Sequence, residues 1–182
     1  MKTLTILVRK DLKGYFDQPT GYILLVIFAG VSSYLFFEAA LTSGEASLRP
    51  LFGVMPWMLA VFVPAATMRL VAEEQRDGTL EILLTHPLKG WNILVAKYLT
   101  GLLFVSAGLA ATLGIPILLA TAGNLDEGAI AAQYIGTLFL VASFTAIGLF
   151  TSSLTRNQIV AFIMALTIIM TLMMAGSPLV TF

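Results

Sequence analysis

Few residues of this sequence have side chains that could carry out catalysis. Among its 182 residues there is one histidine, His86, and no cysteine. Without cysteine the chain has no disulfide framework, thiolate metal site or thiol nucleophile, and no HExxH, GxSxG or Cys/His cluster occurs in it. We interpret His86, which directly precedes Pro87, as a neutral side chain at a membrane surface rather than a catalytic or pH-sensing group. We therefore expect no catalytic residue, metal ligand or bound cofactor in this chain.

Glu38 is the only acidic residue inside a long apolar segment of the sequence. A carboxylate within a bilayer is by default a candidate for binding a proton or a substrate. Glu38 lies within one helical turn of the end of its segment, so its side chain can reach water there. We therefore favour a solvated carboxylate at the membrane surface over a binding role for Glu38.

The composition predicts that lipid covers most of the protein surface. Hydrophobic residues make up 58% of the chain and charged residues 11%, with a mean hydropathy of +0.94, whereas about a quarter of the residues of a soluble domain are charged. Apolar windows of about twenty residues predict an all-α, polytopic membrane protein with five spans. They cover residues 21–41, 51–68, 93–122, 129–151 and 159–175. The third span is long and contains Pro116, so we expect it to be tilted or kinked.

Basic residues lie almost entirely on one side of these predicted spans. Only Arg49 of the ten Lys and Arg residues lies on the other side. The nine are Lys2, Arg9, Lys10, Lys13, Arg69, Arg76, Lys89, Lys97 and Arg156. Because basic loops stay in the cytoplasm, we expect a cytoplasmic N-terminus and a fifth span that runs outward. The polar start of the chain lacks a signal-peptide cleavage pattern, so the first span is predicted to remain as an anchor.

Residues 1–17 are predicted to form an amphipathic helix at the membrane interface. The apolar side comprises Leu4, Val8, Leu12 and Tyr15, and the basic side comprises Lys2, Arg9 and Lys13. Asp11 falls at the edge of the apolar side, which weakens the pattern. Basic residues on the polar side suit a helix that lies on the anionic inner leaflet. The alternative is a basic tail that only sets the topology.

The segment 72–91, AEEQRDGTLEILLTHPLKGW, lies between the second and third spans and is neither a span nor a simple loop. Its residues 77–79, Asp-Gly-Thr, predict a turn and a helix start, and Pro87 ends that helix. Leu80, Leu83 and Leu84 share one face of it, and Glu81 and Thr85 share another. So short a helix needs a surface to dock against. That surface is either the lipid headgroups or a cytoplasmic protein.

This segment resembles the ABC-2 permeases, whose pattern joins a glutamate pair, a basic residue, a Gly-Thr-Leu-Glu run, aliphatic residues, a proline and an aromatic residue. Here these are Glu73, Glu74, Arg76, residues 78–81, residues 82–84, Pro87 and Trp91. The sequence is most similar to the gliding-motility-associated branch, which includes nitrous-oxide-cluster-like permeases. That likeness rests on QPTGY at 18–22, PAATMR at 64–69, GNLDEG at 123–128 and SSLTRNQIVAF at 152–162.

The resemblance implies one subunit of an exporter in the bacterial inner membrane, which pairs with a second copy or a sister permease. The chain has no GxxxxGK[ST] motif, so ATP would be bound by a separate cytoplasmic ABC ATPase, on which a coupling helix docks. The coupling residues implied are Glu73, Glu74, Arg76, Gly78, Thr79, Leu80, Glu81, Leu83 and Leu84. The family has six spans and we predict five, so either the sequence is a fragment or its last span is lost or supplied otherwise.

Three other kinds of function are alternatives to an ABC permease. A proton-coupled secondary transporter would need charged or polar residues near the membrane midplane and internal repeats, and neither is evident. An intramembrane hydrolase would need Ser/His, Glu/His or paired-Asp groups within the spans. A membrane scaffold without its own transport pathway needs no chemistry, and it remains the main alternative. The sequence indicates no nucleic-acid partner and leaves the cargo open.

Overall fold

The computed structural model describes residues 2–43, 48–79, 90–120 and 126–176, and these residues form helices and no strands. The helices are α1 (Lys2–Asp17), α2 (Pro19–Ser43), α3 (Arg49–Thr67), α4 (Ala72–Arg76), α6 (Gly90–Ala111), α7 (Gly114–Ala120), α8 (Glu127–Leu154) and α9 (Gln158–Ala175). The predicted all-α fold is confirmed.

Within the described residues, five helical stretches are long and apolar enough to cross a membrane. They are Pro19–Glu38, Arg49–Arg76, Gly90–Leu119, Glu127–Leu154 and Gln158–Ala175. At a rise of about 1.5 Å per residue, stretches of this length match a hydrocarbon core of about 30 Å. The prediction of five spans in a multi-pass membrane protein is confirmed.

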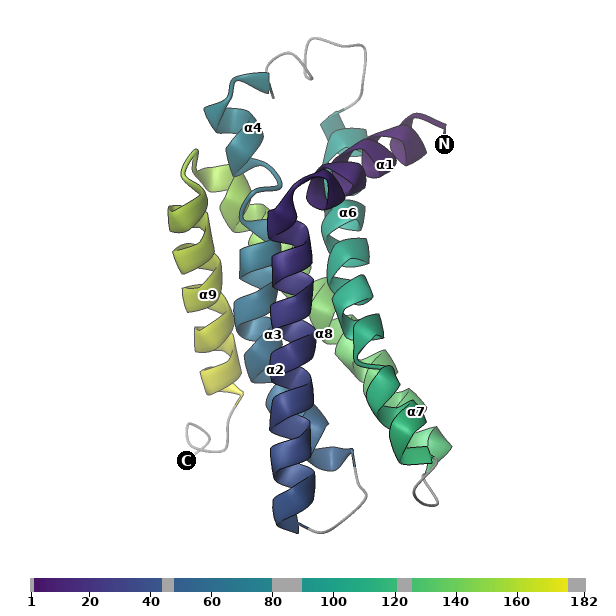
Figure 1. Ribbon diagram of the computed structural model, residues 1–182. Coiled ribbons are helices and arrows are strands. Elements are labelled where there is room, and N and C mark those ends of the chain that lie inside the picture. Colours follow the sequence, from purple (N-terminus) through teal and green to yellow (C-terminus); the bar gives the residue numbers. More distant parts are fainter. Residues whose placement is uncertain (1, 44–47, 80–89, 121–125, 177–182) are drawn as a thin grey trace.

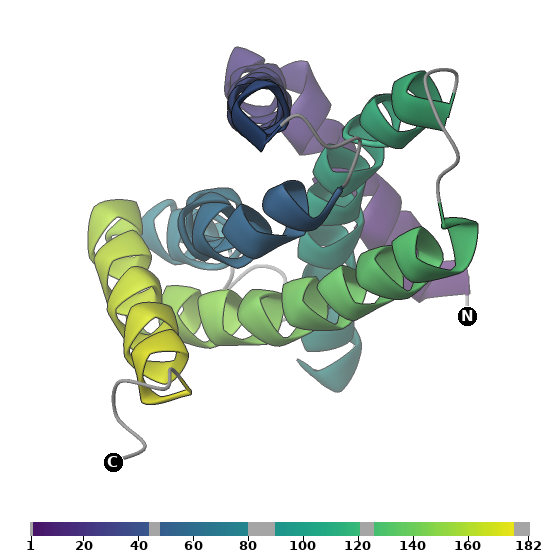
Figure 2. The same ribbon diagram turned by 90° about the horizontal axis from the view of Figure 1, so that it is seen from below.

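Helix α3 is the centre of the bundle. It contacts α2, α6, α8 and α9, and Figure 2 shows it between α2 and the pair formed by α8 and α9. Its buried side chains Met55, Leu59 and Val63 follow each other at intervals of four residues, which places them on one face. Half of the α3 span is buried, against 17% of the α9 span. Most of the surface of α9 therefore faces outward from this subunit.

The third span is broken where its sequence predicts a kink. Helix α6 ends at Ala111 and α7 begins at Gly114. At the break the amides of Thr112 and Ile115 donate to the carbonyl three residues earlier rather than four. A proline ring clashes with the carbonyl four residues before it, and for Pro116 that residue is Thr112. The kink expected at Pro116 is therefore present as the break between α6 and α7.

One end of the bundle gathers α1, α4, the start of α6 and the turn between α8 and α9 (Figure 1). We call this the basic end, because the described members of the nine basic residues all lie there. Lys89, the remaining one, lies outside the described residues. Arg49 starts α3 at the opposite end.

Candidate functional site

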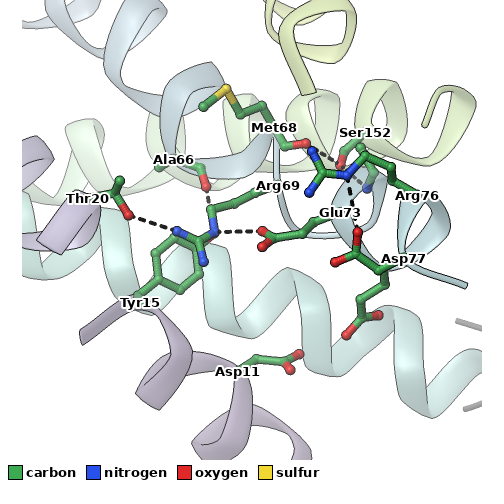
Figure 3. A network of polar contacts seen from close by, with 12 residues as sticks. Asp11, Tyr15, Thr20, Ala66, Met68, Arg69, Glu73, Arg76, Asp77 and Ser152 are labelled. Carbon is green, nitrogen blue, oxygen red and sulfur yellow. Dashed lines mark hydrogen bonds and ion pairs between the residues drawn. The ribbon is translucent and has the colours of Figure 1, made fainter. Parts of the chain in front are cut away.

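Helix α4 is the described element that leads into the predicted coupling segment. It has only five residues, and its N-terminal residues receive no side-chain cap from their own segment. Ser152 of α8 supplies one, because its Oγ accepts hydrogen bonds from the amides of Val71 and Ala72, both at 3.1 Å. The same oxygen donates to the carbonyl of Met68 at 2.9 Å (Figure 3). One buried hydroxyl thus satisfies three backbone groups at the junction of α3 and α4.

A second contact from α4 strengthens its hold on α8. The side-chain amide of Gln75 donates from Nε2 to the carbonyl of Ser153 at 3.0 Å. All of these bonds between α4 and α8 join uncharged groups. They fix α4 to the end of the fourth span.

On another side α4 is held by charged groups around Lys97 of α6. The Lys97 Nζ lies 2.6 Å from Oε1 of Glu74 and 3.0 Å from Oδ2 of Asp11 in α1. The lysine is only 5% exposed, and a buried ammonium is stable only when paired in this way. The second oxygen of Glu74, Oε2, is buried and has no hydrogen-bond partner among the described residues. We call Asp11, Glu74 and Lys97 the Lys97 cluster.

Tyr15 and Arg69 join α1 to the end of α3. The buried Tyr15 hydroxyl donates to the carbonyl of Ala66 at 2.6 Å, and the Arg69 guanidinium lies 5.0 Å from the centre of the tyrosine ring. Arg69 also binds Glu73 at 3.2 Å and Thr20 at 3.0 Å (Figure 3). Burial raises the pKa of Tyr15 well above its usual value, which keeps the hydroxyl neutral and able to donate.

These groups surround a cavity of about 220 Å³ at the basic end. Its charged lining residues are Lys10, Arg69, Lys97, Asp11, Glu73, Glu74 and Asp77. Both signs are present, so the charges largely compensate one another within the chain. The described residues contain no group of three His, Cys, Asp or Glu side chains suited to a metal ion. The geometry is that of a junction between helices.

The predicted coupling residues divide into two sets in the structure. Glu73 binds Arg69, Glu74 binds Lys97, and Arg76 binds its neighbour Asp77 at 3.1 Å. Gly78 has a φ of +71°, a backbone conformation that favours glycine, and so makes the predicted turn. The Thr79 hydroxyl lies 3.4 Å from the carbonyl of Glu74. The second set, Leu80, Glu81, Leu83 and Leu84, lies outside the described residues, as does His86.

The glutamate pair, Glu73 and Glu74, binds residues of this chain itself. The described part of the coupling segment is therefore anchored to the helix bundle. Sequence reasoning missed the partners in that anchor: Asp11, Tyr15, Lys97 and Ser152. Asp11 gave one signal, since a carboxylate at the edge of an apolar helix face needs a cation nearby. Ser152 gave another, since it opens the last of the motifs quoted for the resemblance.

Comparison with known proteins identifies the family of the chain. The family model described as ABC-2 family transporter protein matches residues 20–182. The matched region therefore begins at the second residue of α2, and helix α1 lies outside it. No curated protein and no solved structure matches the chain.

Proposed function

The chain belongs to the ABC-2 family of transporter proteins, and from that premise we propose that it is the membrane subunit of an exporter driven by a separate ATP-binding protein. Such a subunit needs a cytoplasmic segment that receives force from the ATPase and passes it to the spans. In this chain, that role is proposed for residues 72–91.

The observation that carries the proposal is the way α4 is held. Helix α8 binds it through Ser152, and helix α6 binds it through Lys97. Helix α1 is linked to it indirectly, because Asp11 pairs with the same lysine. Helix α4 also follows α3 with only residues 68–71 between them. A push on the segment that follows α4 would therefore move α3, α6 and α8 together. A loop that only connected two spans would not need such attachment.

The basic end is proposed to face the cytoplasm of a bacterial inner membrane. The support is the distribution of nine basic residues against one together with the positive-inside rule. With this orientation the coupling segment projects toward a cytoplasmic ATPase. Two membrane subunits, either two copies or this chain and a sister permease, would complete the pathway. Membership of the gliding-motility-associated branch stays a prediction.

Copurification tests the proposed function. The tagged chain is purified in mild detergent from membranes that also contain its cognate ATPase, and retained subunits are photolabelled with an azido analogue of ATP. We expect a labelled subunit in stoichiometric amount. Purification of the chain in folded form, with its other subunits but without any ATP-binding one, would instead favour the membrane scaffold.

A single substitution locates the contact. Leu83→Asp removes an apolar anchor and places a charge in the docked face, so we expect ATPase binding to weaken about tenfold or more, since a buried leucine is worth about 1.5–3 kcal/mol. Thr85→Asp is the matched control, because Thr85 lies on the other predicted face. Normal ATPase binding by Leu83→Asp, with the segment merely loosened from lipid, would show that these residues form an interfacial helix.

A further inference from the structure

We propose that the pocket between α4 and the turn joining α8 to α9 binds the phosphate of an anionic phospholipid headgroup. This inference goes beyond the proposed coupling to an ATPase and does not depend on it. It concerns the motif at residues 152–162, of which the attachment of α4 uses only the two serines, Ser152 and Ser153.

The pocket has a volume of about 500 Å³ and is lined by Arg76, Thr155, Arg156, Asn157, Gln158 and Ile159. Two guanidinium groups from distant parts of the sequence therefore share one space, with hydroxyl and amide side chains around them. Among the described residues, no acidic side chain lines this pocket, whereas four carboxylates line the cavity at the Lys97 cluster. Guanidinium groups are chemically matched to phosphate, which accepts hydrogen bonds from their planar forks.

The two arginines have different surroundings. Arg76 donates through Nε to Asp77 at 3.1 Å, and a guanidinium that does so still carries two terminal NH2 groups that can bind phosphate. Arg156 stands in a turn of three residues between the end of α8 at Leu154 and the start of α9 at Gln158. Asn157 caps α9 by accepting the amide of Ile159 at 2.9 Å, so the positive end of an 18-residue helix adds to the field of the arginines.

The position of the pocket favours lipid over a soluble ligand. Leu154 is 56% exposed and Ile159 67% exposed, so exposed apolar side chains flank Arg156 on both sides in the chain. The apolar helical stretches on either side of Arg156 end at Leu154 and resume at Gln158. A turn of three residues cannot carry Arg156 far from this boundary. At the depth where apolar helices end, the phosphates of lipid headgroups are the abundant anions.

Lipid retention by the purified full-length chain tests the proposal. The protein is exchanged from detergent into an equal mixture of phosphatidylglycerol and phosphatidylcholine, re-extracted, and measured by native mass spectrometry. We expect preferential retention of phosphatidylglycerol and about fivefold weaker retention by Arg156→Gln, the effect of one basic residue near a membrane surface. Arg156→Lys should keep most of the preference. Arg49→Gln, at the opposite end of α3, is the matched control and should behave like the wild type.

The remaining outcomes distinguish the sources of an anion. Equal retention of the two lipids, or equal loss in Arg156→Gln and Arg49→Gln, would overturn the proposal. So would displacement of phosphatidylglycerol by inorganic phosphate at similar concentrations, which would indicate a site for the free anion. Weaker ATPase binding in Arg156→Gln with unchanged lipid retention would assign the pocket to the protein partner instead. Each variant's elution profile and thermal unfolding show whether it is folded.

Discussion

Helix α4 is attached to its neighbours by two kinds of interaction on two sides. Toward α8 the bonds are neutral, with the Ser152 hydroxyl and the Ser153 carbonyl as acceptors. Toward α1 and α6 the attachment is ionic and centres on the buried Lys97. Neutral hydrogen bonds are short-ranged and fix geometry. A buried ion pair holds only while both charges are present and paired. The α8 side therefore fixes where α4 sits, and the α6 side makes its attachment depend on charge.

Removing the cation should break the ionic side and give the largest effect. Lys97→Met leaves Glu74 without its counter-ion and leaves Asp11 with only the exposed Lys10, and breaking a largely buried pair in this way costs about 3–5 kcal/mol. Thermal unfolding in detergent should show a large loss of stability. Lys10→Met is the control, because the Lys10 side chain is 63% exposed and lies 4.0 Å from Asp11, and an exposed pair is worth about 0–1 kcal/mol. Equal losses of stability in the two variants would mean that the Lys97 cluster stabilises the fold no more than an exposed ion pair does.

Removing one hydroxyl should weaken the neutral side by a smaller amount. Ser152→Ala leaves the amides of Val71 and Ala72 without their acceptor, at a cost of about 1–3 kcal/mol. Proteolysis near α4 should become faster. Ser153→Ala is the matched control, because its hydroxyl donates only within α8, to the carbonyl of Phe150 at 2.7 Å, and its own carbonyl still accepts Gln75. If the Ser152→Ala protein were as stable as the wild type and its proteolysis unchanged, the Ser152 hydroxyl would not be needed to hold α4 against α8.

Tyr15→Phe should have the smallest effect on stability, and it tests the hydrogen bond that joins α1 to the end of α3. The substitution removes the hydrogen bond to Ala66 but keeps the ring, which stacks on Phe104 at 4.4 Å, so we expect a loss of about 1 kcal/mol. Tyr22→Phe is the control, since Tyr22 is 53% exposed. Denaturation of the two variants beside the wild type at neutral pH measures this difference.

The same tyrosine predicts a dependence on pH. Its pKa is raised in the folded protein from a usual value of 10.0, so above that value the unfolded chain loses a proton that the folded one keeps. Stability is then full below about pH 10 and falls as the pH rises further. The fall should be shallower in Tyr15→Phe than in wild type and Tyr22→Phe. Identical pH profiles would mean that Tyr15 ionises equally in both states.

The sequence predicted the helices and spans because they depend on local patterns. Apolar runs of about twenty residues and Pro116 were sufficient for five spans and the break in the third. The junction at the basic end depends on contacts between distant residues. Lys97 read as a topology signal at the start of an apolar span, and nothing local indicated that it meets Asp11 and Glu74. Such pairing is decided by how the helices pack, which periodicity does not encode.

The bond between Tyr15 and Ala66 spans 51 residues, and this separation has a consequence for biosynthesis. Helix α1 leaves the ribosome before its partners at the end of α3 and in α6 are made. Until α6 is inserted, Asp11 lacks its pairing with Lys97 and Tyr15 lacks the ring of Phe104 on which it stacks. Helix α1 therefore reaches its final position only after these later helices are made, and its docking marks the insertion of α2, α3 and α6.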